Sequence, residues 1–455
     1  MRDLTKNSIS AHIAAMSMPI ALSMALQIAH QFVALHFVSQ LGAAAVAGVN
    51  AGGHVTFAAI ALVQMLSIGT TSLVAQAAGR KDLSRMNELL NQSLGLSFAF
   101  GIAIAALTIW LVPVILGTLL PDPAVAEAAM RFVRAQVIGN AVVFPMVVLS
   151  AAMRGAGLVR IPSLIFTATV ILDIVFVSIL VPGRGPISQF GVDGAGAASS
   201  LALCIGCILM YYYLRSSRNG LAAAGRLLTP KMDAWRHILS IGLPASVDLI
   251  LMFLTTMVVY VAIREAGASA QAGFGIGFRI LQLALLPGLA IGNAATSLVG
   301  QNYGAGNVPR VKEAFVVAAI FNTAAMLILT FVIYSYSTAL ISPFDTDAST
   351  AATAEWFLKV MSSSLVAQGI VYVCTSMFQG LGNTVPALAS SMARFCIFSI
   401  STLWISRQPD FQLHYIWYLM TSAVVVQAAT SLWLLHLEFR KRLSTTHQHA
   451  SRIQA

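Results

Sequence analysis

From Pro19 onward the sequence repeats itself at a constant offset of 225 residues. The alignment needs no gap as far as Gly157 and Gly382. The matched positions are Pro19 with Pro244, Gly42 with Gly267, Thr71 to Val74 with Thr296 to Val299, Gln76 with Gln301, Gly79 with Gly304, Arg85 with Arg310, Glu88 with Glu313, and Asp122 with Asp347. A repeat of this length predicts two homologous halves that share one fold.

The composition places these halves in a membrane. Apolar residues make up 58% of the chain and charged residues only 9%, whereas a soluble domain carries about 25% charge. The mean hydropathy is +0.82. Several segments without Asp, Glu, Lys or Arg exceed the roughly 20 residues that cross a hydrocarbon layer about 30 Å thick. They are Ile13–Phe37, Ala43–Ala78, Leu89–Leu120, Ala314–Phe344 and Phe411–Leu437. The sequence therefore predicts an all-α integral membrane protein.

We expect twelve transmembrane helices in two homologous six-helix lobes. The spans are placed near 13–37, 45–77, 89–116, 125–151, 161–182, 193–214, 238–263, 269–299, 313–341, 354–377, 386–406 and 412–437. This divides the chain into an N-terminal lobe (1–214), a cytoplasmic linker (215–236), a C-terminal lobe (237–440) and a cytoplasmic tail (441–455). Because each lobe has an even number of spans, both have the same orientation, and their pseudo-twofold axis lies along the membrane normal.

The net charge of +10 reflects topology rather than a nucleic-acid partner. With both termini in the cytoplasm, most of the 26 Lys and Arg residues fall in cytoplasmic segments, which is the positive-inside asymmetry. The first span is too long for a signal-peptide core and is interpreted as retained. Cys204 and Cys207 have CxxC spacing but fall inside a span, where we interpret them as one apolar helix face.

Recurrent proline and glycine positions punctuate both halves. Pro19 and Pro244 fall inside matching spans, where a proline frees a backbone carbonyl and permits a kink. Glycine-containing segments follow the second and fourth spans of each half and open the sixth span. These segments are Gln76–Asp82, Gln301–Asn307, Arg154–Gly157, Gln379–Asn383 and Gly191–Gly196.

On these motifs and the twelve-span duplication, the chain resembles the multidrug and toxic compound extrusion (MATE) family of secondary transporters. The resemblance covers nearly the whole chain. It implies two six-helix lobes around a central cavity, and efflux of small organic cations in exchange for H⁺ or Na⁺. It also implies a bacterial cytoplasmic (inner) membrane protein without a cofactor, which we expect to be a monomer.

Two acids fall well inside spans, Asp173 in the fifth and Asp248 in the seventh. A charge at bilayer depth costs about 2.5–3.5 kcal/mol on insertion scales, so such an acid marks an ion or substrate pathway. A carboxyl group that burial makes harder to ionise can bind a proton near neutral pH, as a proton-coupled exchanger requires. The alternative is a carboxyl group that only hydrogen-bonds to a neighbouring helix.

Asp173 resembles the fifth-helix aspartate of the N-lobe cation site in the prokaryotic proton-linked branch of the family. The remaining positions of that site match less well. The first-helix aspartate falls on Ala34, the fifth-helix asparagine on Thr169 and the sixth-helix threonine on Ser199. The loss of one charge weakens a sodium cage more than it weakens a single protonatable carboxyl group, so we expect proton coupling. Sodium coupling stays an alternative.

In the C-terminal half, the seventh-helix glutamate of the sodium-linked branch falls on Met252, and the tenth-helix aspartate falls on Gln368. Asp248 lies one helical turn before Met252 and faces a similar direction. We therefore consider it a substitute for the missing acid.

Basic side chains within the spans are further candidates for the cavity. Arg279 and Arg394 are deep cations that can pair with an acid or line a water-filled cavity. His30, His36 and His54 lie in the first two spans, and His54 occupies the repeat position of Arg279. A membrane histidine is usually a satisfied hydrogen-bonding group, but it can also relay protons.

Other functions are less consistent with the sequence. No GxxxxGK[ST] segment occurs, so transport would draw on an ion gradient rather than on a P-loop ATPase. A lipid-linked saccharide flippase with similar lobes is one alternative, but its cavity would be rich in arginine. A membrane enzyme or a receptor-like protein is another. A metal-dependent membrane enzyme would show paired His and acidic residues, and none is evident, so we expect no enzymatic activity.

Overall fold

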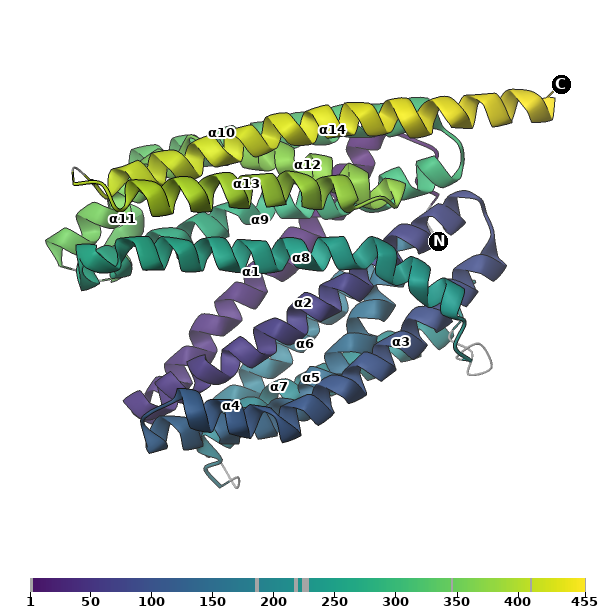
Figure 1. Cartoon of the computed structure of the whole chain (residues 1–455). Coiled ribbons are helices and arrows are strands. Elements are labelled where there is room, and N and C mark those ends of the chain that lie inside the picture. The colour runs from purple at the N-terminus through teal and green to yellow at the C-terminus, as the bar shows by residue number, and fades with distance from the viewer. Residues whose placement is uncertain are drawn as a thin grey trace. The chain divides into compact units, whose positions relative to one another are not determined.

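The computed structural model describes residues 3–184, 188–216, 220–222, 229–344, 347–409 and 411–454, and all regular structure in this part is helical (Figure 1). The α-helices are α1 (Ile9–Ser39), α2 (Ala43–Gly79), α3 (Leu83–Trp110), α4 (Val112–Leu119), α5 (Pro123–Gly155), α6 (Arg160–Leu180), α7 (Gly191–Ser216), α8 (Met232–Ile263), α9 (Ala268–Gly304), α10 (Val308–Ile341), α11 (Ala348–Ser362), α12 (Leu365–Leu381), α13 (Val385–Ile405) and α14 (His414–Gln454). Short 3₁₀ turns follow α8 (η2, Arg264–Ala266) and α10 (η3, Ser342–Phe344).

Within the described residues, 11 helices are long and apolar enough to cross a membrane, and the bent pair α11–α12 completes a twelfth span. The all-helical, twelve-span prediction is therefore confirmed. The third span starts and ends earlier than expected, because α3 runs from Leu83 to Trp110 and a separate helix α4 follows with Pro113 in its first turn. Proline is favoured at that position, where its missing N–H has no helical partner to lose.

The tenth span breaks between α11 and α12 with a bend of 55°. Three consecutive serines explain the break. Their hydroxyl groups donate to backbone carbonyls of the preceding turn, at 2.9 Å for Ser362 to Lys359, 2.6 Å for Ser363 to Val360 and 2.8 Å for Ser364 to Met361. Such bonds compete with the helical ladder. The matching stretch of the first half carries Val137, Ile138 and Gly139, and there α5 runs unbroken.

The repeat is preserved in the packing of the helices. A methyl group added at Gly155 would lie 2.8 Å from the carbonyl oxygen of Thr71, and one added at Gly380 would lie 3.0 Å from that of Thr296. These two pairs are repeat equivalents. The same holds for Gly52 against Phe132 and its counterpart Gly277 against Phe357. Close helix contacts that only glycine allows therefore occur at matching places in α2–α5 and in α9–α11–α12.

The helix starts repeat in the same way. Gly42 and Gly267 precede α2 and α9 with φ of 102° and 92°, a backbone conformation that favours glycine. Asp122 and Asp347 cap α5 and α11, and each accepts a hydrogen bond from a backbone N–H of the first turn. Equivalent residues thus perform equivalent local tasks in both halves.

The chain forms two compact units. Unit 1 contains Leu22–Gly242 and unit 2 contains Leu4–Ala21 with Leu243–Ala455. These limits differ from the lobes expected at 1–214 and 237–440. Helix α8 also starts at Met232, inside the segment expected to be a linker, and α14 runs through the expected tail to Gln454.

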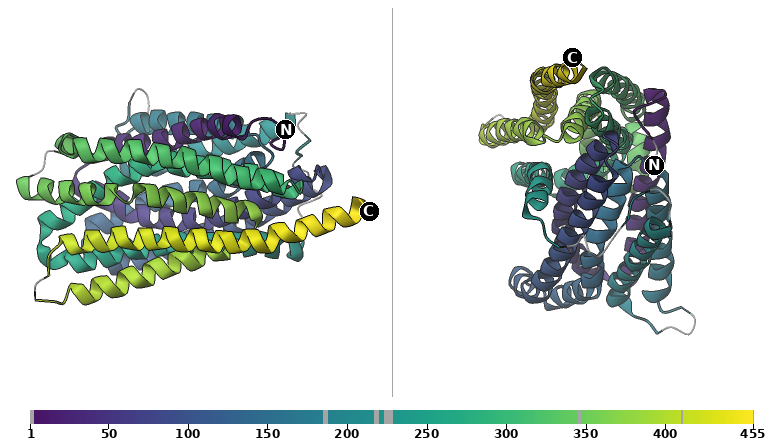
Figure 2. Two further views of the ribbon diagram at one scale, coloured as in Figure 1. Left: turned by 90° about the horizontal axis from the view of Figure 1, so that it is seen from above. Right: turned by 90° about the vertical axis from the view of Figure 1, so that its right-hand side faces the viewer.

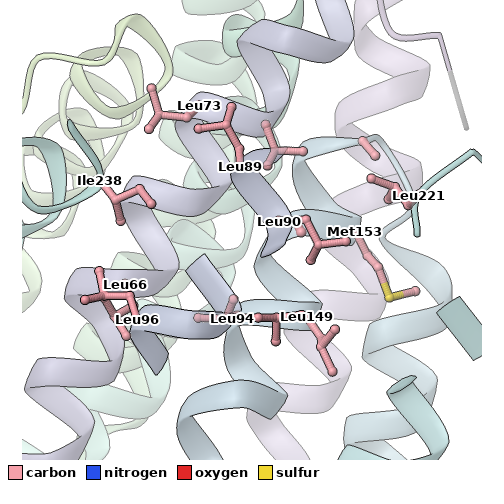
Figure 3. Close-up of a cluster of buried hydrophobic side chains, with 14 of the residues drawn as sticks. Leu66, Leu73, Leu89, Leu90, Leu94, Leu96, Leu149, Met153, Leu221 and Ile238 are labelled. Atoms are coloured by element: carbon pink, nitrogen blue, oxygen red, sulfur yellow. The ribbon is translucent and has the colours of Figure 1, made fainter. Parts of the chain in front are cut away.

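Each unit has its own apolar core, built from helices that run alongside one another (Figure 2). In unit 1, leucines of α2, α3 and α5 pack together with Met153 (Figure 3). In unit 2, Trp417 stacks on Phe274 at 5.5 Å between ring centroids and meets Phe357 edge-on at 5.0 Å. The packing of each core fixes the helices that carry the polar side chains described below.

Candidate functional site

Asp173 lies in the middle of α6 within unit 1, and its carboxylate is paired with a hydroxyl from the next helix. The Ser199 hydroxyl of α7 lies 3.2 Å from Oδ1 and 3.0 Å from Oδ2, and donates to the carboxylate. The Asp173 side chain is only 12% exposed. A buried carboxylate with a single protein donor is costly, which favours a further partner or a bound proton.

That further partner is His30 of α1. Its Nε2 lies 3.1 Å from Asp173 Oδ2, and the imidazole is 17% exposed. The contact has the distance of an ion pair without the direction of a hydrogen bond, and Nε2 has no other partner among the described residues. Three helices therefore bring a carboxylate, an imidazole and a hydroxyl together, and we call this group the Asp173 cluster (His30, Asp173, Ser199).

His30 was considered in the sequence only as one of three membrane histidines, and it was not assigned to Asp173. One signal points to it. The first-helix aspartate position of the resembled site falls on Ala34, and His30 lies four residues earlier, on the same helix face. A titratable group is therefore kept on that face of α1, one turn away from the expected position.

Thr169 and His54 do not join this cluster. The Thr169 hydroxyl donates to the Ile165 carbonyl at 2.9 Å, within its own helix, and a methyl group added at Gly206 of α7 would clash with it. His54 is exposed on α2. Of the unit 1 candidates, Asp173 and Ser199 are brought together and the other two are not.

A second polar cluster lies within unit 2. The Asp248 carboxylate of α8 is within hydrogen-bonding range of Ser391 and attracts the guanidinium group of Arg394, both on α13. From α12, Tyr372 interacts with both charged groups and bonds to Gln368. We call this group the Asp248 cluster (Asp248, Gln368, Tyr372, Ser391, Arg394).

The sequence explains why these side chains meet. Ser391 and Arg394 are three residues apart and Gln368 and Tyr372 are four apart, so each pair shares one helix face. Gln427 of α14 donates to the Ser391 hydroxyl at 2.9 Å and ties a further helix to the cluster. The Arg394 Nε atom is buried and has no hydrogen-bond partner among the described residues.

The other two unit 2 candidates lie outside this network. Met252, one turn after Asp248, is 38% exposed. Arg279 is exposed on α9. The two prolines, Pro19 and Pro244, both lie inside helices, in α1 and α8. Ser391 and Tyr372 are site residues that the sequence reasoning did not identify, because neither carries a charge.

The two clusters differ in their electrostatics. The partner of Asp173 is a histidine, whose side chain has a neutral and a charged form. The partner of Asp248 is an arginine, which stays charged under all physiological conditions. The Asp173 cluster therefore combines an acid with a group that has a neutral form, whereas the Asp248 cluster places an acid near a permanent cation.

Neither cluster has the ligands of a metal site. Among the residues that the structure describes, no group of three or more His, Cys, Asp or Glu side chains could hold a metal ion. The Asp173 cluster offers two kinds of side-chain oxygen and one imidazole, while hard cations prefer oxygen ligands alone.

Comparisons with known proteins agree with this architecture. A protein-family model described as MatE matches residues 19–179 and again 244–405, so that each match begins at one of the repeat prolines. A probable multidrug resistance protein, YpnP of Bacillus subtilis, is 24% identical over 91% of this chain and 90% of its own length. A probable multidrug resistance protein, NorM of Thermotoga maritima, is 24% identical over 80% of this chain and 77% of its own length.

Solved structures show the same fold. A MOP superfamily transporter from Pyrococcus furiosus superimposes with a TM-score of 0.89 at 23% identity, over 98% of both chains. The outward-facing conformation of a multidrug resistance MATE family transporter gives the same TM-score, identity and coverage. At this level of identity, the likeness concerns the arrangement of the helices.

Proposed function

Because the chain belongs to the MatE family of multidrug and toxic compound extrusion transporters, we propose that it exports small organic molecules in exchange for protons by alternating access. The exchange takes place across a bacterial cytoplasmic membrane, with both termini inside and one chain as the working unit. Relatives named as multidrug resistance and multidrug export proteins support the efflux part of this proposal. The proton part rests on the site.

The observation that carries the proposal is the 3.1 Å approach of His30 to Asp173, with Ser199 on the same carboxylate. This pair can exist with a net charge of −1, when the imidazole is neutral, or of zero, when one proton is bound. In the charged state the cluster attracts a cationic molecule, and in the neutral state it does not. Competition between a proton and a cationic substrate for one site is the requirement of an exchanger.

The energy source follows from the same exchange. A one-for-one exchange of a proton for a monovalent cation moves no net charge, so the pH gradient supplies its energy; for a neutral substrate the membrane potential adds about 2.3 kcal/mol per 100 mV. Protonation of the cluster from outside lowers its affinity for a cation and favours release there. Loss of the proton to the cytoplasm restores the negative charge and the affinity for the next substrate.

The Asp248 cluster has a different part in the proposal. With a permanent cation beside it, Asp248 is better suited to a fixed ion pair than to a second proton carrier. We assign to the attraction between Asp248 and Arg394 the role of holding α8 and α13 in register, with Tyr372 of α12 near both charges. We assign to Tyr372 and Gln368 contacts with the polar parts of a substrate, and to Met252 an adaptable apolar contact.

The substrate class follows the charge of the cluster that titrates. A site that alternates between −1 and zero selects organic cations, which matches the relatives with multidrug names. One relative, of Shewanella oneidensis, is named an FAD transporter and is 21% identical over 79% of this chain. An anionic cargo of that kind, or a lipid-linked saccharide, would need more cationic side chains than Arg279 and Arg394 supply.

The test is dye efflux in everted membrane vesicles that contain the chain. We expect ethidium transport to stop when a protonophore collapses the proton gradient, and to continue when the sodium gradient is dissipated with the pH held constant. Vesicles from cells without the chain are the control. Transport that follows the sodium gradient would contradict proton exchange, and transport of anions alone would contradict the substrate class.

A further inference from the structure

Arg154, in the last turn of α5, is a cation without an acidic partner. Packed protein surrounds its guanidinium group, although part of the residue's surface stays accessible. The group donates one hydrogen bond, from Nη2 to the Ser67 hydroxyl of α2 at 2.9 Å. The ion pairs among the described residues of unit 1 all involve other basic side chains. Taking a guanidinium group out of water is costly unless an opposite charge compensates it.

The guanidinium group of Arg154 keeps free donors. Arginine carries five N–H groups in a planar fork, and here only Nη2 bonds to protein. In unit 2, the Nε atom of Arg394 is sealed from solvent without a partner, whereas no nitrogen of Arg154 is sealed in that way. The free N–H groups of Arg154 therefore face a space that water can enter.

Hydroxyl groups accompany this cation on both helices. Thr70 lies one turn from Ser67 on α2, and Ser150 lies one turn from Arg154 on α5, so each pair shares a helix face. The hydroxyl groups of Thr70 and Ser150 are buried and have no hydrogen-bond partner in the described part of the chain. A buried hydroxyl group without a partner is unfavourable, and it can donate to an anion.

The two helices that carry these groups are held close together. The Thr71 hydroxyl of α2 donates to the Ala151 carbonyl of α5 at 3.2 Å. A methyl group added at Gly155 would lie 2.8 Å from the Thr71 carbonyl oxygen. On α5, Leu149 and Met153 point into the apolar core of unit 1 (Figure 3). Because the backbones are fixed, the donors are arranged before a ligand arrives, which lowers the cost of binding.

The equivalent place in unit 2 is built without a charge. The matched positions are Arg154 with Gln379, Ser67 with Gly292, and Thr70 with Ala295. The Gln379 side-chain oxygen accepts a hydrogen bond from the Thr296 hydroxyl at 3.3 Å, and Gly380 keeps the close approach to the Thr296 carbonyl. The fold therefore forms this helix contact without the cation and without these hydroxyl groups, so helix packing does not explain their presence in unit 1.

The dipole of α5 gives only part of an explanation. A cation in the last turn of a helix is favoured by the partial negative charge at that end. An exposed side chain would serve this purpose equally well. The dipole does not account for the contact of Arg154 with Ser67 on another helix, nor for the unpaired hydroxyl groups of Thr70 and Ser150.

We propose that Arg154, Ser67, Thr70 and Ser150 form a binding site for one phosphate group. The guanidinium fork can donate two parallel hydrogen bonds to such a group, a geometry that arginine favours. The Ser67 hydroxyl accepts from Arg154, so its own hydrogen stays available for the ligand. A phosphate group offers more acceptor oxygens than a carboxylate and so matches donors on two helices. The group is carried by a free phosphate ion or by a phospholipid headgroup at the end of the span.

The first test titrates the purified protein in a neutral detergent with inorganic phosphate at constant ionic strength. A ligand that binds the folded state raises the melting temperature as the site fills. We expect a saturable rise for the wild type, a smaller one with acetate, and none for Arg154→Gln, which introduces the residue of the equivalent position in unit 2. Arg160→Gln removes an exposed charge at the start of α6 and is the matched control, which should respond like the wild type.

A second arm identifies the source of the phosphate group. Native mass spectrometry detects phosphatidylglycerol that stays bound after detergent extraction. A lipid retained by the wild type and lost from Arg154→Gln assigns the site to a headgroup. A response to inorganic phosphate without a retained lipid assigns it to the free ion. A wild type that shows neither, or an Arg154→Gln variant that matches the wild type in both measurements, would overturn the proposal.

Ser67→Ala tests whether the hydroxyl group belongs to the site. We expect the affinity for phosphate to fall by about tenfold, as for loss of one hydrogen bond to a charged group. An unchanged affinity would contradict a site that includes Ser67. Asp173→Asn should bind phosphate like the wild type, because the proton site is separate. Failure of the phosphate site and failure of proton exchange can therefore be told apart.

Discussion

The two halves of this chain place an acid in the membrane in two different ways. In unit 1, Asp173 faces His30, a group that can lose its charge, whereas in unit 2 Asp248 faces Arg394, a group that cannot. The halves descend from one repeat, yet Arg394 occupies the repeat position of Thr169. Duplicated lobes can therefore keep their helix packing while the partners of their deep acids differ in chemistry.

This comparison also explains why the acids are not at equivalent positions. Asp173 corresponds to Phe398, and Asp248 corresponds to Ser23. Each acid interacts with partners from its own unit, so it does not require an acid at the equivalent position of the other repeat. The shared features are the glycine contacts and the helix caps, and these make the scaffold rather than the chemistry.

Among the variants that test this difference, we expect Asp173→Asn to have the largest effect on efflux. The variant keeps the shape and the Ser199 contact but cannot exchange a proton, so we expect proton-driven efflux to fall by at least about a hundredfold, as for loss of an essential proton-transfer group. Efflux in everted vesicles measures it. Asp193→Asn, which removes a more exposed carboxylate paired with Arg131 in the same unit, is the matched control and should retain efflux. Wild-type efflux in Asp173→Asn would refute the proton site.

The next effect concerns stability in unit 2. Arg394→Gln removes the cation that attracts the Asp248 carboxylate and so leaves a largely desolvated acid without compensation. We expect a lower melting temperature in detergent, largely recovered when Asp248→Asn is added. The exposed Arg279→Gln serves as the control and should melt like the wild type. If the double variant is no more stable than Arg394→Gln, the two side chains do not act as a pair.

His30→Gln sharpens the contrast within the titrating cluster. Glutamine keeps a polar contact to Asp173 but cannot take up a proton, so under the proposed exchange the pH profile of efflux should change. We expect a loss of about tenfold at the optimum of the wild type. His36→Gln, on the same helix but near Gln40, is the control. An unchanged pH profile in His30→Gln would remove the histidine from the mechanism.

The smallest effect lies outside the membrane, at the start of α11. Hydrogen bonds from Ser349 and Thr350 lower the pKa of Asp347 to about 2. A carboxyl group with a lowered pKa in the folded state adds stability above its unfolded pKa of about 3.9, and this is lost as the pH falls toward 2. Asp347→Asn should therefore lower the melting temperature slightly at pH 6 and not at pH 2. Equal effects at both values would rule out a charge contribution.

Much of the fold could be predicted from the sequence, because the membrane imposes its lengths and the duplication supplies a second copy of every signal. The break at Ser362–Ser364 was missed, because three polar but uncharged serines lower the mean hydropathy of the span too little to divide it. Their hydroxyl bonds to the preceding turn become visible only with coordinates. The separate helix α4 was also missed. Pro113 lies in an apolar stretch, and a proline there is compatible either with a kink or with the start of a new helix.

The candidate site divides in the same way. Asp173 and Asp248 could be singled out because a charge at bilayer depth is rare and costly. Ser199 followed from the family resemblance, and the structure brings it to Asp173. Thr169 followed from the same resemblance, but its hydroxyl turns to its own helix. Whether a hydroxyl group points toward a neighbouring helix or back to its own helix depends on its rotamer, which no sequence pattern specifies.

The sequence by itself determined that this is a duplicated, twelve-span membrane protein with two deep acids, since hydrophobic length and an exact offset are properties of the chain alone. Only the tertiary structure decided which cation each acid faces. It also decided that the first helix of each repeat begins in the unit that consists mainly of the other repeat. Both depend on how helices distant in the sequence approach one another, and that is decided by side-chain packing across their faces rather than by any local pattern.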